Sequence, residues 1–106
     1  MSRGRIYVDG IPAGIIEKRA GEFYFTYLDD YFTDQSKPSV SLTLNKSQKE
    51  YISKVLFPFF YGLLAEGELK EIQCRTLKID ENDHFTRLLK TAGKDVIGSV
   101  TVEEIE

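Results

Sequence analysis

One stretch of the chain, Val55 to Ala65, has no charged side chain, and four of its eleven residues are aromatic. If the stretch is helical, the large apolar side chains between Leu56 and Leu64 cover an arc of about 200° at 100° per residue. A surface helix normally has an apolar stripe only a little over 100° wide. The segment is therefore either a central helix covered by the rest of the domain or a helix that keeps aromatic surface for a partner. The two interpretations are compatible, since one side of a helix can lie in the core while the other side binds.

The first third of the chain predicts an antiparallel meander of three strands. Asp9-Gly10 is among the strongest short hairpin signals, and Ala20-Gly21 marks a second turn. Pro12 lacks an N–H group, so it is expected at an edge or in a lengthened turn and not in the middle of a ladder. The predicted strands are Arg5–Val8, a return strand that includes Ile15 and Ile16, and Glu22–Leu28, whose core face has period two and comprises Phe23, Phe25 and Tyr27.

The middle of the chain is predicted to be less regular. Residues 29–38 are polar and turn-rich apart from Tyr31 and Phe32, and we expect a loop there. In residues 40–44 apolar side chains alternate with Ser and Thr, which indicates another short extended segment. Residues 45–50 are polar and expected to be exposed.

Three helices are predicted in the second half. The first is the charge-free segment itself, with Pro58 in its first turn and Gly67 in the left-handed conformation after its end. The second, about Glu68–Leu77, places three residues on one side: Leu69, Ile72 and Thr76. The third is capped by Asp80 or Asp83, closes at Gly93, and has an amphipathic stripe made of Phe85, Leu88, Leu89 and Ala92.

A final strand at Val96–Val102 and a frayed acidic end at Glu103–Glu106 complete the predicted elements. At 106 residues the chain has the length of one domain, and it can bury a core without metal or disulfide. The predicted fold class is therefore α+β: a single small domain, residues 1–106, in which an antiparallel meander packs with about three helices.

Charge and cysteine content limit the possible functions and locations. With 17 acidic and 14 basic residues and a net charge of -3, the chain lacks the basic cluster that binds nucleic acid directly. A single cysteine cannot form an internal disulfide, which favours the reducing cytoplasm. The apolar run before Asp9 is too short for a signal peptide or a membrane span.

The side chains offer little for catalysis. His84 is the only histidine and Cys74 the only thiol, so zinc ligand patterns and histidine clusters are excluded. A nucleophilic pair of these two residues is disfavoured, because Cys74 is predicted in the middle of a helix and His84 beside a cap. The segment from Gly62 to Gly67 lacks the Lys-Ser/Thr of a P-loop. We therefore expect neither an enzyme nor a cofactor nor a bound metal.

Short motifs over nearly the whole chain occur in the order and spacing of a known family. They are Val8-Asp9-Gly10 through Ala13-Gly14-Ile15, Phe25-x-Tyr27, Pro38-x-Val40-Ser41-Leu42-x-Leu44, Phe59-Phe60-x-Gly62-Leu63-Leu64-Ala65-Glu66-Gly67, and Asp83-x-Phe85-x-x-Leu88-Leu89-x-x-x-Gly93-x-Asp95-x-x-Gly98-x-Val100. The sequence resembles the N-terminal subdomain of HipA-type toxin kinases. It departs from the family pattern at Ala65, where the family usually has proline.

Because no kinase motifs follow before Glu106, the chain is similar to HipS, the separate form of this subdomain in HipBST toxin–antitoxin systems. The resemblance implies an antitoxin that binds and inhibits a HipT-type serine/threonine kinase, in a complex completed by the helix-turn-helix protein HipB. One hypothesis is that Glu66 and Glu68 lie near the basic nucleotide site of the kinase; the alternative is that they belong to a helix cap and a solvated turn. The candidate partner-binding residues are Phe57, Phe59, Tyr61, Leu64, Glu66, Gly67, Glu68 and Leu69.

Two other functions stay open at this point. The chain could be the regulatory subunit of a split HipA-type kinase, required for activity and not for restraint. A DNA-binding repressor is disfavoured by the acidic charge and by the lack of a basic recognition helix.

Overall fold

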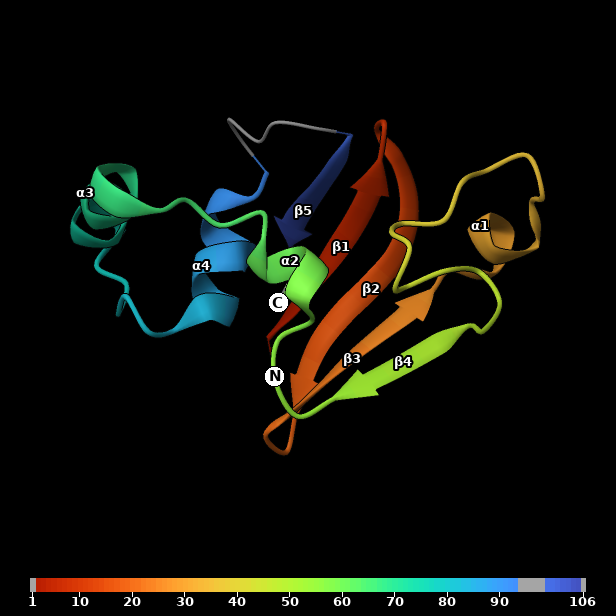
Figure 1. Cartoon of the computed structure of the whole chain (residues 1–106), viewed down its shortest axis with the longest axis horizontal. Helices are drawn as coiled ribbons and strands as arrows, with labels where there is room; N and C mark the ends of the chain where they lie inside the picture. Colours follow the sequence, from red (N-terminus) through yellow and green to blue (C-terminus); the bar gives the residue numbers. More distant parts are fainter. Residues whose placement is uncertain (1, 94–98, 106) are drawn as a thin grey trace.

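A single five-stranded antiparallel sheet, in the order β4-β3-β2-β1-β5, forms the body of the molecule (Figure 1). The structure is a computed structural model and describes residues 2–93 and 99–105. Its strands are β1 (Arg3–Val8), β2 (Ile11–Arg19), β3 (Glu22–Tyr27), β4 (Glu50–Ser53) and β5 (Val100–Glu104). Its helices are α1 (Asp29–Thr33), α2 (Pro58–Tyr61), α3 (Gly67–Leu77) and α4 (His84–Thr91).

The predicted meander is confirmed. Both turns have positive φ at both central residues, 51° and 79° at Asp9-Gly10 and 50° and 80° at Ala20-Gly21. This geometry matches the right-handed twist of the flanking strands, so β1, β2 and β3 pair in sequence. Pro12 differs from the expectation, since it lies within β2, opposite Tyr7. It fits there because the register shifts at this point and because β3 does not pair with β2 before Gly14.

Aromatic rings from the sheet and the helices make the centre of the core. The Phe25 ring packs 4.9 Å from that of Tyr27 and 5.8 Å from that of Phe60 in α2, centroid to centroid. At the start of β3, Phe23 meets Phe85 of α4 edge-on at 5.5 Å. A Cβ atom on Gly14 would lie only 2.7 Å from the Phe25 ring, so β2 needs glycine at this position.

The amphipathic stripe of the third predicted helix is confirmed in α4. All four stripe residues are buried, and the side chain of Asp83 caps the helix by accepting a hydrogen bond from the N–H of Thr86 at 3.1 Å. Asp80, the alternative cap, instead accepts from the N–H of Asn82 in the preceding turn. The helices pack on one face of the sheet, against the inward-facing side chains of the strands. On the other face, which we call the open face, the side chains are partly exposed, as at Arg5, Tyr7, Ile15, Tyr24 and Thr26.

The charge-free segment is not one long helix, so that prediction is wrong. Only the single turn α2 is helical, with Pro58 in the first turn as expected, and it ends at Gly62. Leu56, Phe57 and Leu64 lie outside α2 and are nevertheless buried. Burial of apolar surface outweighs helix propensity here, because an irregular backbone lets side chains on both sides of α2 reach the core. Gly67 does have a positive φ, 61°, but it begins α3 and does not close α2.

The segment between β3 and β4 also differs from the expectation. Residues 29–33 form α1, and 40–44 form a turn in place of an extended segment. Leu44 is buried while Leu42 is 95% exposed, so the two do not share a core-facing side. The hydroxyl of Tyr27 accounts for this shape, since it donates to the carbonyl of Leu44 and accepts from the N–H of Val40. Tyr31 likewise donates to the carbonyl of Pro38 at 2.6 Å.

Residues 103 and 104, expected to fray, belong to β5. Glu103 accepts a hydrogen bond from the hydroxyl of Tyr7 at 2.8 Å, and Glu104 pairs with Lys90 of α4 at 2.6 Å. These cross-strand and cross-layer contacts hold the acidic end in the sheet. The start of the predicted final strand, residues 96–98, lies outside the described residues, while 100–102 are confirmed as strand. β4 was not predicted.

The turn at 40–44 is testable with a matched pair of substitutions. We expect Leu44→Ala to lower the free energy of unfolding by about 2–5 kcal/mol, because it opens a cavity in the core. Leu42→Ala, two residues away, should change it by no more than about 0.5 kcal/mol. Urea denaturation of both variants measures the difference. Similar losses in the two variants would show that both leucines face the core, as an extended segment requires.

The buried hydroxyl of Tyr27 should make stability fall at alkaline pH. Burial raises the pKa of Tyr27 above its ordinary value of about 10. The folded state therefore holds this proton more tightly than the unfolded state, and the associated stability is present below pH 10 and lost as the pH rises through the raised pKa. Tyr27→Phe should be less stable at neutral pH by about 1–2 kcal/mol, because Val40 and Leu44 lose a partner. Between about pH 8 and 11, however, the variant should lose less stability than the natural chain in urea unfolding, and an equal loss would contradict this role.

A candidate protein-binding face on the third helix

α3 is nearly detached from the core. Of its eleven residues only Cys74 is buried. The predicted stripe of Leu69, Ile72 and Thr76 does lie on one side of the helix, because at 100° per residue the three span about 60°. That side is turned to solvent, with Leu69 53% and Ile72 47% exposed. We call these three residues the docking face.

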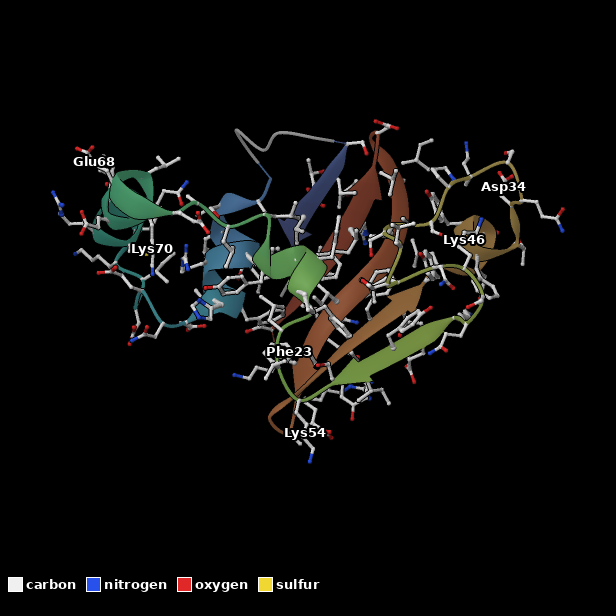
Figure 2. The ribbon with its side chains drawn as sticks, viewed as in Figure 1. Phe23, Asp34, Lys46, Lys54, Glu68 and Lys70 are labelled. Atoms are coloured by element: carbon white, nitrogen blue, oxygen red, sulfur yellow. The ribbon has the colours of Figure 1, made fainter. Side chains whose placement is uncertain are left out.

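The position of the docking face follows from the helix geometry. Cys74 is about 140° around the helix from Leu69 and about 160° from Ile72, so the contact that holds α3 to the body turns both residues outward. In Figure 1, α3 stands at the far end of the molecule from β4. Figure 2 shows Glu68 and Lys70 on this same outlying helix. Leu69 and Ile72 are three residues apart and therefore neighbours on the helix surface.

The chain that enters α3 is held by a buried arginine. Arg87 of α4 is only 3% exposed, and its guanidinium donates to the carbonyl of Ala65 at 2.7 Å. A second guanidinium nitrogen lies 3.2 Å from Nδ1 of His84, whose ring in turn meets the Tyr61 ring edge-on at 4.9 Å. This chain of contacts fixes the start of α3 relative to α2 and α4. Sequence reasoning missed it, because a charged residue beside an apolar stripe normally faces solvent.

The structure divides the eight candidate residues by exposure. Phe57 and Leu64 lie in the core, where their side chains are not available to a partner, and Phe59 packs partly against the core. Tyr61 is half exposed, and the four residues from Glu66 to Leu69 are exposed at the start of α3. The exposed candidates from Glu66 to Leu69 therefore lie within two helical turns of Ile72, which was not among the predicted partner-binding residues. Whether they bind a partner stays a prediction.

Two arrangements considered from the sequence, a metal cluster and a Cys74–His84 pair, are not found among the described residues. Within residues 2–93 and 99–105 no group of three or more His, Cys, Asp or Glu side chains could hold a metal ion. No hydrogen bond joins Cys74 to His84 in this part of the chain, and Cys74 is buried while His84 contacts Tyr61 and Arg87. None of the described helices is long and apolar enough to cross a membrane.

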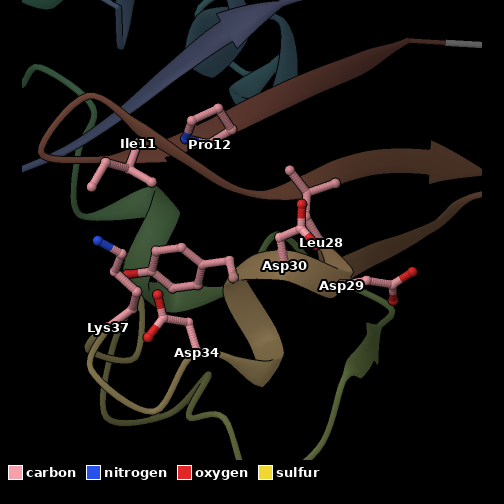
Figure 3. Close-up of a pocket in the computed structure, with 8 residues that line it drawn as sticks. Ile11, Pro12, Leu28, Asp29, Asp30, Asp34 and Lys37 are labelled. Carbon is pink, nitrogen blue, oxygen red and sulfur yellow. The ribbon is translucent and has the colours of Figure 1, made fainter.

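A hollow of about 590 Å³ lies between the β1–β2 turn and α1 (Figure 3). Ile11, Pro12 and Leu28 form its apolar wall, and three aspartates stand around it. One of them, Asp29, pairs with Lys49. Another, Asp34, accepts hydrogen bonds from Ser36 that hold its pKa below the ordinary value. The Asp34–Ser36 contacts stabilise the turn after α1, and Asp29 is already paired, so the hollow is a weaker candidate site than the docking face.

The comparisons with known proteins agree on one family. The family model described as the HipA N-terminal domain matches residues 4–103. A Haemophilus influenzae protein is 34% identical over 95% of this chain and 91% of its own length. A Sinorhizobium fredii protein named as a kinase is 32% identical over 81% of this chain, but the match spans only 22% of that protein. Among solved structures, an N-terminal domain of HipA toxin matches all of this chain and 94% of its own with a TM-score of 0.73 and 28% identity.

These matches cover the N-terminal domain and none of them includes a kinase catalytic domain. The five-stranded antiparallel sheet with its helices is the fold of that domain, as the resemblance implied. The chain belongs to the HipA N-terminal domain family.

Proposed function

We propose that this chain is a non-catalytic antitoxin that binds and neutralises a HipT-type serine/threonine kinase, in a complex that a HipB-type helix-turn-helix protein completes. The observation that carries the proposal is the exposed docking face of α3. The face belongs to a domain whose family includes kinase proteins, and it is separated from the domain's own core. Its natural occupant is therefore the kinase domain that this family accompanies.

The energetics of α3 support binding at this helix. An isolated helix of eleven residues is marginal in water, and α3 buries only Cys74 against the body. Packing Leu69 and Ile72 against a partner would bury apolar surface worth about 1 kcal/mol for each half-exposed side chain. A partner would thus stabilise the helix while it gains affinity from the same contacts.

Charges at the start of α3 favour a basic surface on the kinase. Glu66 and Glu68 are exposed beside Leu69. A nucleotide-binding site must attract phosphate groups and is therefore positively charged. Acidic side chains next to an apolar anchor could occupy such a site and hinder ATP, which gives the proposed inhibition a physical route.

The relatives support action on a separate kinase chain. The aligned region fills 91% of the Haemophilus protein, which leaves no room in it for a kinase domain. The Sinorhizobium protein named as a kinase contains a related segment in 22% of its length. The family thus has members with and without further domains, and an N-terminal domain on its own chain would have to act in trans.

The docking face is tested by a double substitution, Leu69→Asp with Ile72→Asp. We expect it to weaken binding to the kinase encoded by a neighbouring gene by about 100-fold or more, because two apolar anchors become charged. Isothermal titration calorimetry measures the affinity, and circular dichroism checks that the domain stays folded. The control is Leu42→Asp, which places one such charge on a leucine outside α3 that is 95% exposed. Equal affinity in all three proteins would remove the docking face as the kinase site.

A second measurement is needed to decide whether the chain inhibits or activates the kinase. We expect the chain to suppress phosphorylation by the kinase at equimolar amounts and to restore growth when the two are expressed together. The double variant should do neither. Toxicity that arises only with both chains present would instead identify an activating subunit of a split kinase.

A further inference from the structure

β4 forms one edge of the sheet in the described part of the chain, and no further strand pairs with its outer side there. Tyr27 donates its N–H to the carbonyl of Lys49 at 2.9 Å, so that pair is hydrogen-bonded across the β3–β4 ladder. Hydrogen-bonded pairs alternate along an antiparallel ladder, which makes Phe25 with Tyr51 and Phe23 with Ser53 the next ones. The N–H and C=O groups of Glu50 and Ile52 therefore point away from β3. The side-chain amide of Gln48 agrees with this direction, since it donates to the carbonyl of Glu50 at 2.8 Å, and a partner strand would take the place of that amide.

Along this edge, one apolar side chain lies between two charged side chains of opposite sign. Ile52 pairs with Tyr24 across the ladder and is 56% exposed on the open face. Glu50 shares that face, where its carboxylate accepts from the hydroxyl of Thr26 at 3.1 Å. Lys54 follows the end of the strand and extends from the corner of the sheet in Figure 2. An exposed isoleucine is thus flanked, two residues away on either side, by opposite charges.

We propose that β4 pairs antiparallel with β4 of a second copy of this chain, in the register that places Ile52 opposite Ile52. In that register Glu50 of each copy lies opposite Lys54 of the other, which gives two oppositely charged pairs around one apolar pair. The backbone groups of Ile52 and Glu50 point outward as the pairing requires, and the two sheets join into one of ten strands. The pairing is isologous, so it closes as a dimer.

Other registers that use the same outward backbone groups are less favourable. A shift in one direction places Glu50 against Ile52, and a shift in the other places Ile52 against Lys54. β5, the opposite edge, carries Glu103 and Glu104 and no basic residue between 100 and 104, so it would repel a second copy. Charge complementarity therefore selects both the edge and the register.

The size of the contact defines the kind of dimer. Two short paired strands bury less than the roughly 1,200 Å² of a standard stable interface, so the dimer forms and separates readily and appears only at high protein concentration. β4 is the sheet edge farther from α3 in Figure 1, so the docking face stays free on both copies. The inference does not depend on the proposed function.

Charge reversal tests the pairing in the full chain. Sedimentation equilibrium between about 10 μM and 1 mM should show an apparent mass that rises from one chain toward two. Lys54→Glu alone, or Glu50→Lys alone, places like charges opposite each other twice and should weaken dimerisation about tenfold or more. The reciprocal variant with both changes restores opposite charges and should return dimerisation to within about threefold of the natural chain.

Controls separate the edge from other surfaces. Arg75→Glu makes the same change of charge on α3 and should leave dimerisation unaltered, while urea denaturation verifies that every variant is folded. A chain that stays monomeric over the whole range overturns the proposal. So does a dimer that the single reversals leave intact, that the reciprocal variant fails to restore, or that Ile72→Asp abolishes.

Discussion

The packing of Phe25 against its neighbours joins the two halves of this fold. Its ring lies over Gly14 of β2, beside Tyr27 of its own strand and against Phe60 of α2. Aromatic pairs in tilted or edge-on arrangements contribute about 0.5–1.5 kcal/mol each beyond the area that they bury. Because the sheet side of this contact comes from the first third of the chain and the helix side from residues near 60, folding must bring distant segments together here. The other helices pack around that contact, whereas α3 lies away from it.

An element could be predicted from the sequence when the residues that determine it lie close together in the chain. The meander could be predicted because two turn dipeptides and a period-two aromatic pattern are local, and α4 because its cap and stripe lie within ten residues. The turn at 40–44 could not, since its shape depends on the hydroxyl of Tyr27, which is thirteen or more residues away in sequence. β4 is short, with one exposed isoleucine between polar residues, and it is a strand only because β3 offers it an edge.

The same distinction applies to the candidate site. The stripe on α3 was visible in the sequence, but only tertiary packing decides that its apolar side faces solvent. The charge-free segment, by contrast, suggested exposed aromatic surface, and the structure buries most of it through an irregular backbone on both sides of α2. Exposed apolar side chains are thus present in the described part of this domain, and three of the eight large ones, Leu69, Ile72 and Leu77, lie on α3. Arg87 had no sequence signal at all, because its partner is a backbone carbonyl at Ala65.

The anchorage of α3 has a consequence for how sequences of this kind can diverge. One buried cysteine and one arginine-to-carbonyl hydrogen bond hold the helix, so the identity of the residues on its outer side contributes little to folding. Those positions can therefore accumulate substitutions without loss of the native state. A duplicated gene could acquire a new specificity at Leu69, Ile72 and Thr76 while the Phe25 core stays unchanged, and related pairs in one cell could in this way remain insulated from one another.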